Sequence, residues 1–492
     1  MRETVLAFVK TWTRRLALVL ALPVGGAVFL VLYVIATVAS YEQLDNSEKL
    51  ASKNAYLAAL PRAVSALSPD IVVILFDDLG YGDVGFTGNR SIRTPYMDAL
   101  AENGVVMTNY FSPAPVCSPS RAAMLTGRMA PRNGLTAVPF PSGSPIDRVN
   151  RFFANPVRLP REEIIISEVL QATGFHTAMV GKWHMGDHDK SIPTEFGFDR
   201  FFGTYHSNDM TPFYLVEGVA GAGEKIAHAA PVDQTNLNAL YAEKAEQFIA
   251  DAPTNTPLFL YFAHNFPHVP LFTAADEQGR SEAGLYGDVV QGLDDTVGRI
   301  VAALKQRGKF DNTLIVITSD NGPWWEGRGI GRGRKGETFE GGVHVPFVAH
   351  WPRQLKPAMS DELVMGSDLL PTLLEELRVV APDDRKLDGR SISQTLRGGP
   401  SPHEALYFYG GGTLMAVRQG RYKYRDRKPL VYATDPVFIP VWGSHGPWLF
   451  DMQTDADEAY DVSTHRPDVA ARLKNILDAR NAEMDANPRG WK

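Results

Sequence analysis

The chain carries one uninterrupted apolar run that leads straight into two carboxylates, Ile71-Val72-Val73-Ile74-Leu75-Phe76-Asp77-Asp78. A continuous run of β-forming residues is typical of a strand that is covered on both faces of a parallel sheet. A second such run, Leu314-Ile315-Val316-Ile317, leads into Thr318-Ser319-Asp320-Asn321-Gly322. The two predicted strands therefore finish alike, with acid and amide side chains at their carboxyl ends.

Helical and strand-like segments alternate on either side of these runs. Apolar residues recur at helical spacing over 285–304, before the second strand, and similar helix-to-strand steps lead from 162–173 to 178–180 and from 240–250 to 258–262. This alternation predicts an α/β sandwich, with helices on both faces of a largely parallel sheet, over residues 70–400. Short strands at 415–417 and 422–424 and a final helix at 467–487 predict a smaller C-terminal α+β subdomain over 401–492.

Composition excludes two broad classes of protein. The 492 residues are 44% hydrophobic and 21% charged, which is the composition of a folded globular chain and not of a disordered one. The net charge of −7 provides no basic field to attract nucleic acid, so we expect no nucleic-acid partner.

The N-terminal region predicts a membrane anchor. Residues 16–39 form an uncharged stretch of 24 residues, long enough to span a bilayer core of roughly 30 Å. Basic residues within 1–15 predict a cytosolic N-terminus, and residues 40–69 then form a short helical or flexible stalk that leads to an exported catalytic domain, periplasmic or extracellular. The alternative is a signal peptide cleaved near Val38-Ala39-Ser40, which would release a secreted protein.

Polar side chains at the two strand ends predict a metal site. Asp77, Asp78, Asp320 and Asn321 should meet, because the carboxyl ends of parallel strands lie at one edge of a sheet. Carboxylates brought together repel one another unless a cation neutralises them. An all-oxygen cluster selects a hard ion, calcium or magnesium, in preference to zinc.

Cys117 is the only cysteine, so it forms no disulfide within the chain. Ser118 as N-cap and Pro119 at the first helical position predict a helix that starts directly after it. Residue 117 would then face the positive end of the helix, with Arg121 one turn along, an environment that favours an anionic nucleophile. A plain thiolate nucleophile is compatible with this pattern.

Cys117-Ser118-Pro119-Ser120-Arg121, followed by Leu125-Thr126-Gly127-Arg128, resembles the signature of the type I sulfatases. In that family a separate maturation enzyme, the formylglycine-generating enzyme, oxidises the cysteine to formylglycine (3-oxoalanine). The resemblance extends from about residue 70 to about residue 467, and residues 414–418 and 447–451 are similar to the branch that contains arylsulfatase A and steroid sulfatase. It implies an alkaline-phosphatase-like sandwich, with a large, mostly parallel mixed sheet flanked by helices and a small antiparallel C-terminal sheet.

The resemblance also implies roles for individual residues. Asp77, Asp78, Asp320, Asn321 and the modified Cys117 would hold the metal, and Arg121 would steady the nucleophile. His264 is expected to be structural. The other catalytic residues that the resemblance implies are Lys182, His184, Ser207, His268 and Lys335.

A sulfuric ester hydrolase is the activity that follows from this resemblance. In its chemistry a hydroxyl of the aldehyde hydrate attacks sulfur, Asp320 takes the proton, and His184 helps the second hydroxyl to expel sulfate. The substrate would be a sulfated small molecule or glycan, with pocket walls expected from the aromatic and histidine side chains Tyr205, His206, Trp324, Trp325, His445 and Trp448. Two alternatives are a phosphonate monoester or phosphodiester hydrolase of the same superfamily and a catalytically inactive, membrane-tethered binding protein.

Overall fold

The computed structural model describes residues 37–38, 41–62, 64–65, 67–187, 190–428 and 445–492. Strand β1 (Asp70–Phe76) lies in the middle of a ten-stranded sheet, in the order β11-β2-β10-β9-β1-β8-β4-β5-β6-β7. It pairs in parallel with β9 (Thr313–Ser319) on one side and with β8 (Leu258–Ala263) on the other. The two apolar runs of the sequence are therefore direct neighbours, as the shared edge of the predicted metal site requires.

The sheet is parallel at its centre and mixed toward its edges. Strands β4 (His176–Lys182) and β5 (Arg200–Thr204) extend the parallel region beyond β8. Antiparallel pairings then join β10 to β9 and to β2, and β6 to β5 and to β7. The remaining strands are β2 (Val105–Met107), β6 (Leu215–Val219), β7 (Gly223–His228), β10 (Phe347–His350) and β11 (Ala358–Ser360).

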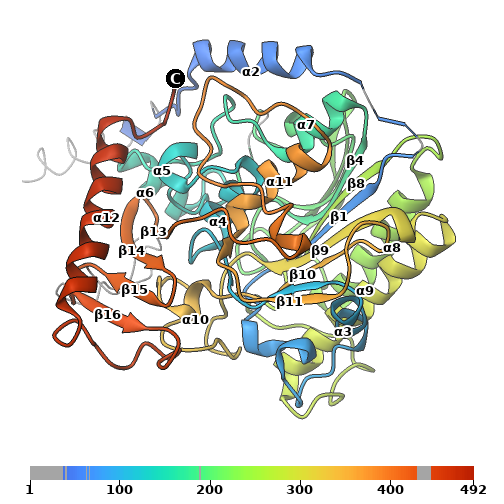
Figure 1. Cartoon of the computed structure of the whole chain (residues 1–492). Coiled ribbons are helices and arrows are strands. Elements are labelled where there is room, and N and C mark those ends of the chain that lie inside the picture. Colours follow the sequence, from blue (N-terminus) through green and yellow to red (C-terminus); the bar gives the residue numbers. More distant parts are fainter. Residues whose placement is uncertain (1–36, 39–40, 63, 66, 188–189, 429–444) are drawn as a thin grey trace, which may run out of the picture.

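Helices cover both faces of this sheet (Figure 1). Alternate residues of β1 point to opposite cores: Ile71, Val73 and Leu75 pack in one, and Val72, Ile74 and Phe76 in the other. The first core includes residues of α4 (Cys117–Thr126), α7 (Ile166–Thr173) and α11 (Leu369–Glu376), and the second includes residues of α3 (Pro95–Glu102), α8 (Leu237–Asp251) and α9 (Gly284–Gln306). The predicted α/β sandwich is confirmed.

A smaller antiparallel sheet lies at one side of the molecule, next to the long C-terminal helix α12 (Pro467–Ala486) (Figure 1). Its four strands are β13 (Leu406–Gly410), β14 (Thr413–Gln419), β15 (Tyr422–Arg425) and β16 (Trp448–Asp451). Buried Lys423 of β15 links this sheet to the segment that precedes β10, because its ammonium lies 3.0 Å from a carboxylate oxygen of Glu340 and 3.0 Å from one of Glu458. Glu340 opens the short helix α10 (Glu340–Val343). The boundary at residue 400 stays a prediction.

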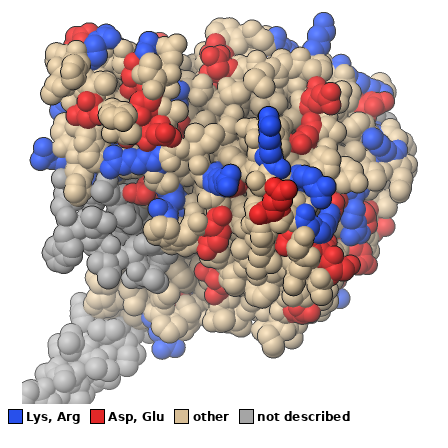
Figure 2. Space-filling view, turned by 90° about the horizontal axis from the view of Figure 1, so that it is seen from below, with Lys and Arg blue, Asp and Glu red and all other residues tan. Residues whose placement is uncertain are grey.

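Further short elements include helices α5 (Ala130–Asn133) and α6 (Pro145–Phe152), and a two-stranded sheet of β3 (Tyr110–Phe111) and β12 (Val364–Met365). On the face of the molecule that Figure 2 shows, Lys and Arg side chains are interspersed with Asp and Glu.

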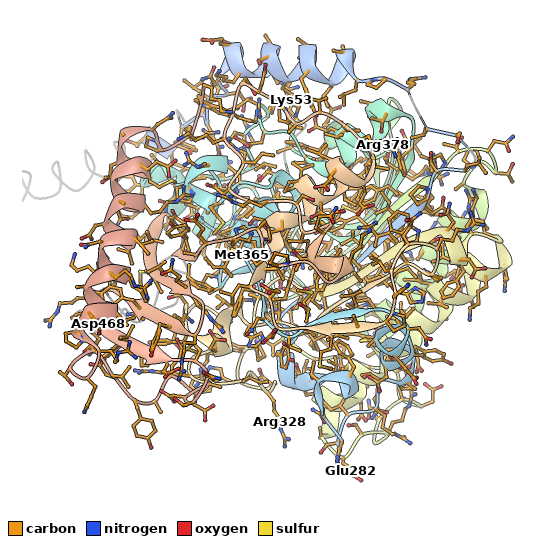
Figure 3. The ribbon with its side chains drawn as sticks, viewed as in Figure 1. Lys53, Glu282, Arg328, Met365, Arg378 and Asp468 are labelled. Atoms are coloured by element: carbon orange, nitrogen blue, oxygen red, sulfur yellow. The ribbon has the colours of Figure 1, made fainter. Side chains whose placement is uncertain are left out.

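The predicted membrane anchor lies outside the described residues, apart from Thr37 and Val38. Within the described part of the chain, no helix combines the length and the apolar character needed to cross a bilayer. The stalk over residues 40–69 stays a prediction; within it, the helix α2 (Ser47–Ala59) lies against the body of the molecule. Lys53 points from α2 into the body (Figure 3) and pairs with Glu168 of α7 at 2.5 Å.

We expect Lys53→Ala to lower the free energy of unfolding by about 3–5 kcal/mol, because the change leaves the buried carboxylate of Glu168 without its partner. Denaturant unfolding of the purified protein measures the loss. Lys474→Ala is the control, since Lys474 forms an exposed pair with Asp478 that water and salt screen. An equal, small effect of both changes would show that α2 contributes nothing to the stability of the domain.

Candidate active site

The two strand ends meet as predicted. Asp77 and Asp78 follow β1, Asp320 and Asn321 follow β9, and the last residues of the two strands, Phe76 and Ser319, are paired in register. All four polar side chains are buried. The Asp78 backbone N–H donates to Asp320 Oδ1 at 3.2 Å, and Asn321 Nδ2 donates to Asp78 Oδ1 at 2.6 Å.

Asp78 adopts a backbone conformation that few non-glycine residues adopt. Its φ of 67° lies in the left-handed region, and His184 across the site has a φ of 59°. Residues in this region cost free energy and persist where the surrounding structure holds them, often at functional sites. The tight turn at Asp78 directs its carboxylate back toward the end of β9.

Two buried cations, Lys182 and Arg121, and the partly buried Lys335 balance the three carboxylates. Lys182 Nζ, at the end of β4, lies 2.5 Å from Asp77 Oδ2, and Arg121 Nε of α4 lies 2.8 Å from Asp320 Oδ2. Lys335 Nζ lies 2.9 Å from Asp78 Oδ1. From the sequence we expect a metal ion to neutralise these carboxylates. The structure adds that three side chains already supply positive charges.

The two aspartates at the centre of the cluster respond differently to these charges. Burial alone would raise the pKa of Asp77, but Lys182, His268 and Arg121 outweigh it, and the pKa lies well below the usual range. Burial and the charge of Asp77 raise the pKa of Asp320 to about 7. Asp320 therefore has the character of a proton acceptor near neutral pH.

Cys117 lies against the same cluster. Its sulfur and carboxylate oxygens of Asp77 and Asp320 all lie within 4.8 Å of one another. Helix α4 begins at Cys117 itself, with Val116 as N-cap, and not after Ser118 as predicted. Proline is accepted anywhere in the first turn of a helix, where backbone N–H groups have no helical acceptor, so Pro119 does not specify the first position.

The remaining predicted residues complete the site. Ser207 Oγ accepts a hydrogen bond from Lys182 Nζ at 3.1 Å and lies 3.4 Å from His268 Nε2, which is itself 3.8 Å from Asp78 Oδ2. His184 is buried and neither ring nitrogen has a hydrogen-bond partner among the described residues. Burial and the nearby Lys182 lower its pKa well below the usual value, so His184 is neutral and able to accept a proton.

His264 lies apart from this chemistry. Its Nδ1 accepts the backbone N–H of Phe266 at 2.9 Å, and its ring packs against Tyr241. Burial lowers the pKa of His264 to about 3, which keeps the ring neutral. The expectation that His264 is structural fits this position.

A cavity of about 450 Å³ leads to the cluster and is lined at its inner end by Cys117, His184, Ser207, His268 and Lys335. Its other walls come from residues 138–146 and 209–211. The pocket walls expected from the sequence were wrong, because these side chains do not line the cavity: Tyr205, His206, Trp324, Trp325, His445 and Trp448.

Sequence reasoning missed a contact that holds the pocket wall. Asp187 accepts hydrogen bonds from the Ser142 backbone N–H at 2.8 Å and from Ser142 Oγ at 2.5 Å, and lies 3.0 Å from His206 Nε2. Burial would raise the pKa of Asp187, but His206 and Ser142 outweigh it and lower that pKa, so the side chain is an anion. The one signal in the sequence for a role of Asp187 near the site is its position three residues after His184.

The residues at the strand ends suit a hard cation. Asp77 Oδ1 and Asn321 Oδ1 are buried oxygens without a hydrogen-bond partner among the described residues. Two groups of potential ligands share Asp77, one with Cys117 and Asp320 and the other with Asp78 and His268. Oxygen ligands of this kind bind calcium or magnesium.

Buried acids and bases beside a cavity are the residue types that an acid–base hydrolase uses. Residues 69–379 match the Sulfatase family model. The chain is 34% identical to arylsulfatase A of Homo sapiens, over 89% of this chain and 92% of that protein, and 35% identical to N-acetylgalactosamine-6-sulfatase of Mus musculus, over 72% and 71%. The crystal structure of the PsFucS1 sulfatase from Pseudoalteromonas sp. is similar, with a TM-score of 0.76 and 25% identity over 91% of this chain and 96% of that one.

The chain belongs to the sulfatase family. It is an enzyme that hydrolyses sulfate esters. The alkaline-phosphatase-like fold that the resemblance implied is confirmed with it.

We expect Asp187→Asn to raise KM for an aryl sulfate about three- to tenfold and to change kcat less than about twofold. The change weakens the hydrogen bonds that hold Ser142 and the pocket wall in place, and it leaves the acid–base cluster intact. Steady-state kinetics measures both constants. Asp199→Asn is a matched control: Asp199 also pairs with a histidine, His176, and accepts a backbone N–H, at the opposite end of β4. A fall in kcat with KM unchanged would contradict this role.

Proposed function

We propose that this sulfatase acts through formylglycine, formed at Cys117 by a formylglycine-generating enzyme of the host. The burial of Cys117 carries the proposal. Burial raises the pKa of the thiol, despite the nearby Lys182 and Lys335, so an unmodified cysteine would stay protonated and react poorly. An aldehyde at this position needs no thiolate, because its hydrate carries two hydroxyl groups on one carbon.

The proposed catalytic cycle has three steps. One hydroxyl of the hydrate gives its proton to Asp320 and attacks sulfur, and the ester bond breaks to release the alcohol, which takes up a proton. The second hydroxyl then gives its proton to neutral His184, the aldehyde re-forms, and sulfate leaves with both electrons of the broken bond. Water adds to the aldehyde and restores the hydrate.

Fixed cations assist both bond-breaking steps. Lys182 lies beside Ser207 and Lys335 beside Asp78, where both ammonium groups can neutralise the sulfuryl oxygens. His268 lies next to Ser207, and because burial lowers its pKa it can assist as a hydrogen-bond donor and not as a fixed charge. Such charges act strongly because the site is shielded from water. Arg121, held by Asp320, steadies the residue at 117 from within the same helix.

We propose calcium as the metal, with magnesium as the alternative. Asp77, Asp78, Asp320 and Asn321 would hold it, together with the modified residue 117. When bound, the ion lowers the pKa of the attacking hydroxyl and draws charge from the ester. Its double charge would also favour ionised Asp320.

We propose that the catalytic domain is exported and tethered by residues 16–39, with residues 1–15 in the cytosol. The uncharged stretch and the basic residues before it support this topology. The N-terminal sequence of the native protein tests it: a mature chain that begins near residue 40 and needs no detergent for release would indicate a cleaved signal peptide.

Protein produced with its maturation enzyme should resist iodoacetamide, lose activity with a hydrazide, and show an aldehyde at residue 117 by peptide mass analysis. Cys117→Ala should be inactive. Cys117→Ser should attack once and then stall as a covalent sulfate ester, because serine has no second hydroxyl on that carbon. Sustained turnover by a serine shown to be unmodified would overturn the diol mechanism.

Removal of divalent ions with a chelator should abolish turnover, and calcium should restore it. In a thermal unfolding assay, calcium at about 100 times its Kd should stabilise the native protein by about 2.7 kcal/mol. Asp78→Ala should lose both the stabilisation and the activity, since Asp78 would be a ligand. Full activity in a metal-free preparation would contradict the metal site, and restoration by magnesium alone would identify the ion as magnesium.

A further inference from the structure

The pocket joins a charged inner end to an apolar wall. The inner end carries the catalytic side chains and Lys335. Residues 138–146 supply most of the remaining wall, whose apolar lining residues are Val138, Phe140, Pro141, Pro145 and Ile146. Met210 adds a sixth apolar side chain. The alcohol part of a bound sulfate ester would therefore contact a largely apolar surface and lose its contact with water.

The one charge on the outer wall is negative. Among the lining residues that the structure describes, the outer wall has only three polar members, Ser144, Asp209 and Thr211. Asp209 is exposed at residues 209–211 and repels a second anionic group on a substrate. A substrate with several sulfate or carboxylate groups would meet this repulsion without a compensating cation.

Arginines of the neighbouring loop do not provide that cation. The guanidinium of Arg332 lies 4.4 Å from the ring centre of Phe339 and 4.7 Å from that of Trp448. Arg334 lies over Trp325 at 3.1 Å. Neither arginine lines the pocket, and exposed Arg328 projects into solvent (Figure 3). Arginine binds oxyanions such as carboxylate and phosphate through two parallel donors, and no arginine is among the described residues that line the pocket.

We propose that this pocket selects sulfate monoesters of uncharged, apolar, ring-bearing alcohols or phenols, and that it discriminates against sulfated glycans. The proposal rests on the sulfatase chemistry proposed above and identifies the alcohol half of its substrate. A cavity of about 450 Å³ holds one or two fused rings in contact with the 138–146 wall. Asp187 keeps that wall in place through Ser142.

The test compares two substrates with matched leaving groups. Cyclohexylmethyl sulfate and glucose 6-sulfate are both primary sulfate esters on a six-membered ring, so their alcohols leave with similar ease. We expect kcat/KM to favour cyclohexylmethyl sulfate by about tenfold or more, because the apolar wall leaves sugar hydroxyls without partners. Equal rates, or a preference for glucose 6-sulfate or glucosamine 2,6-disulfate, would overturn the proposal.

A variant pair assigns the preference to the wall. Ile146→Asn should reduce the ratio of kcat/KM values about fivefold or more, mainly through a higher KM for cyclohexylmethyl sulfate. Val149→Asn on the same helix α6 is the matched control, since Val149 is 44% exposed and does not line the pocket. An unchanged ratio in Ile146→Asn, in protein whose thermal unfolding matches the parent, would contradict the assignment.

Failure of the sulfatase chemistry would look different. Protein that carries the aldehyde at 117 and hydrolyses p-nitrophenyl sulfate but prefers the sugar ester contradicts only the substrate class. Protein that lacks the aldehyde yet turns over any of these esters contradicts the formylglycine mechanism. The ratio of kcat/KM values for cyclohexylmethyl sulfate and glucose 6-sulfate would still test the substrate preference of the 138–146 wall.

Discussion

Asp77, Asp78 and Asp320 place three carboxylates in a region that water does not reach. Such a cluster is stable only if cations lie beside it, and removal of one partner from a buried pair costs about 3–5 kcal/mol. The partners are Lys182 from the end of β4 and Arg121 from α4, with Lys335 from a loop. This requirement for charge balance ties together elements that are more than 200 residues apart in sequence.

Parts of the chain remote from the chemistry maintain this arrangement. Lys423 of the small sheet holds Glu340, which opens α10 five residues after Lys335. Burial and the charge of Glu340 raise the pKa of Glu458 to about 7, although Lys423 opposes both. The small sheet therefore supports the loop that carries an active-site cation, and this contact gives the C-terminal residues a direct part in shaping the site.

The pocket separates two tasks between its two ends. In the proposed mechanism Asp320, which lies behind the inner end, and His184, which lines it, would accept protons beside Lys182 and Lys335, and this arrangement would serve any sulfate monoester. The outer wall differs in character, since apolar side chains of 138–146 and the carboxylate of Asp209 line it, and under the substrate proposal these residues would contact the alcohol part of the ester. Chemistry and substrate choice would then depend on different segments of the chain.

Local sequence was sufficient for the strands, for the polar residues at their ends and for the motif around Cys117. Short uninterrupted runs rich in β-branched residues favour a strand buried on both faces, and the parallel neighbours β1 and β9 bring their ends together. Local sequence placed the start of α4 two residues late, at Pro119 and not at Cys117, because proline fits several first-turn positions. The wrong pocket walls, the docking of α2 and the pairing of Asp187 with Ser142 and His206 all depend on contacts between segments that are distant in sequence. No periodicity or spacing encodes such contacts, so they required the three-dimensional arrangement of the folded chain.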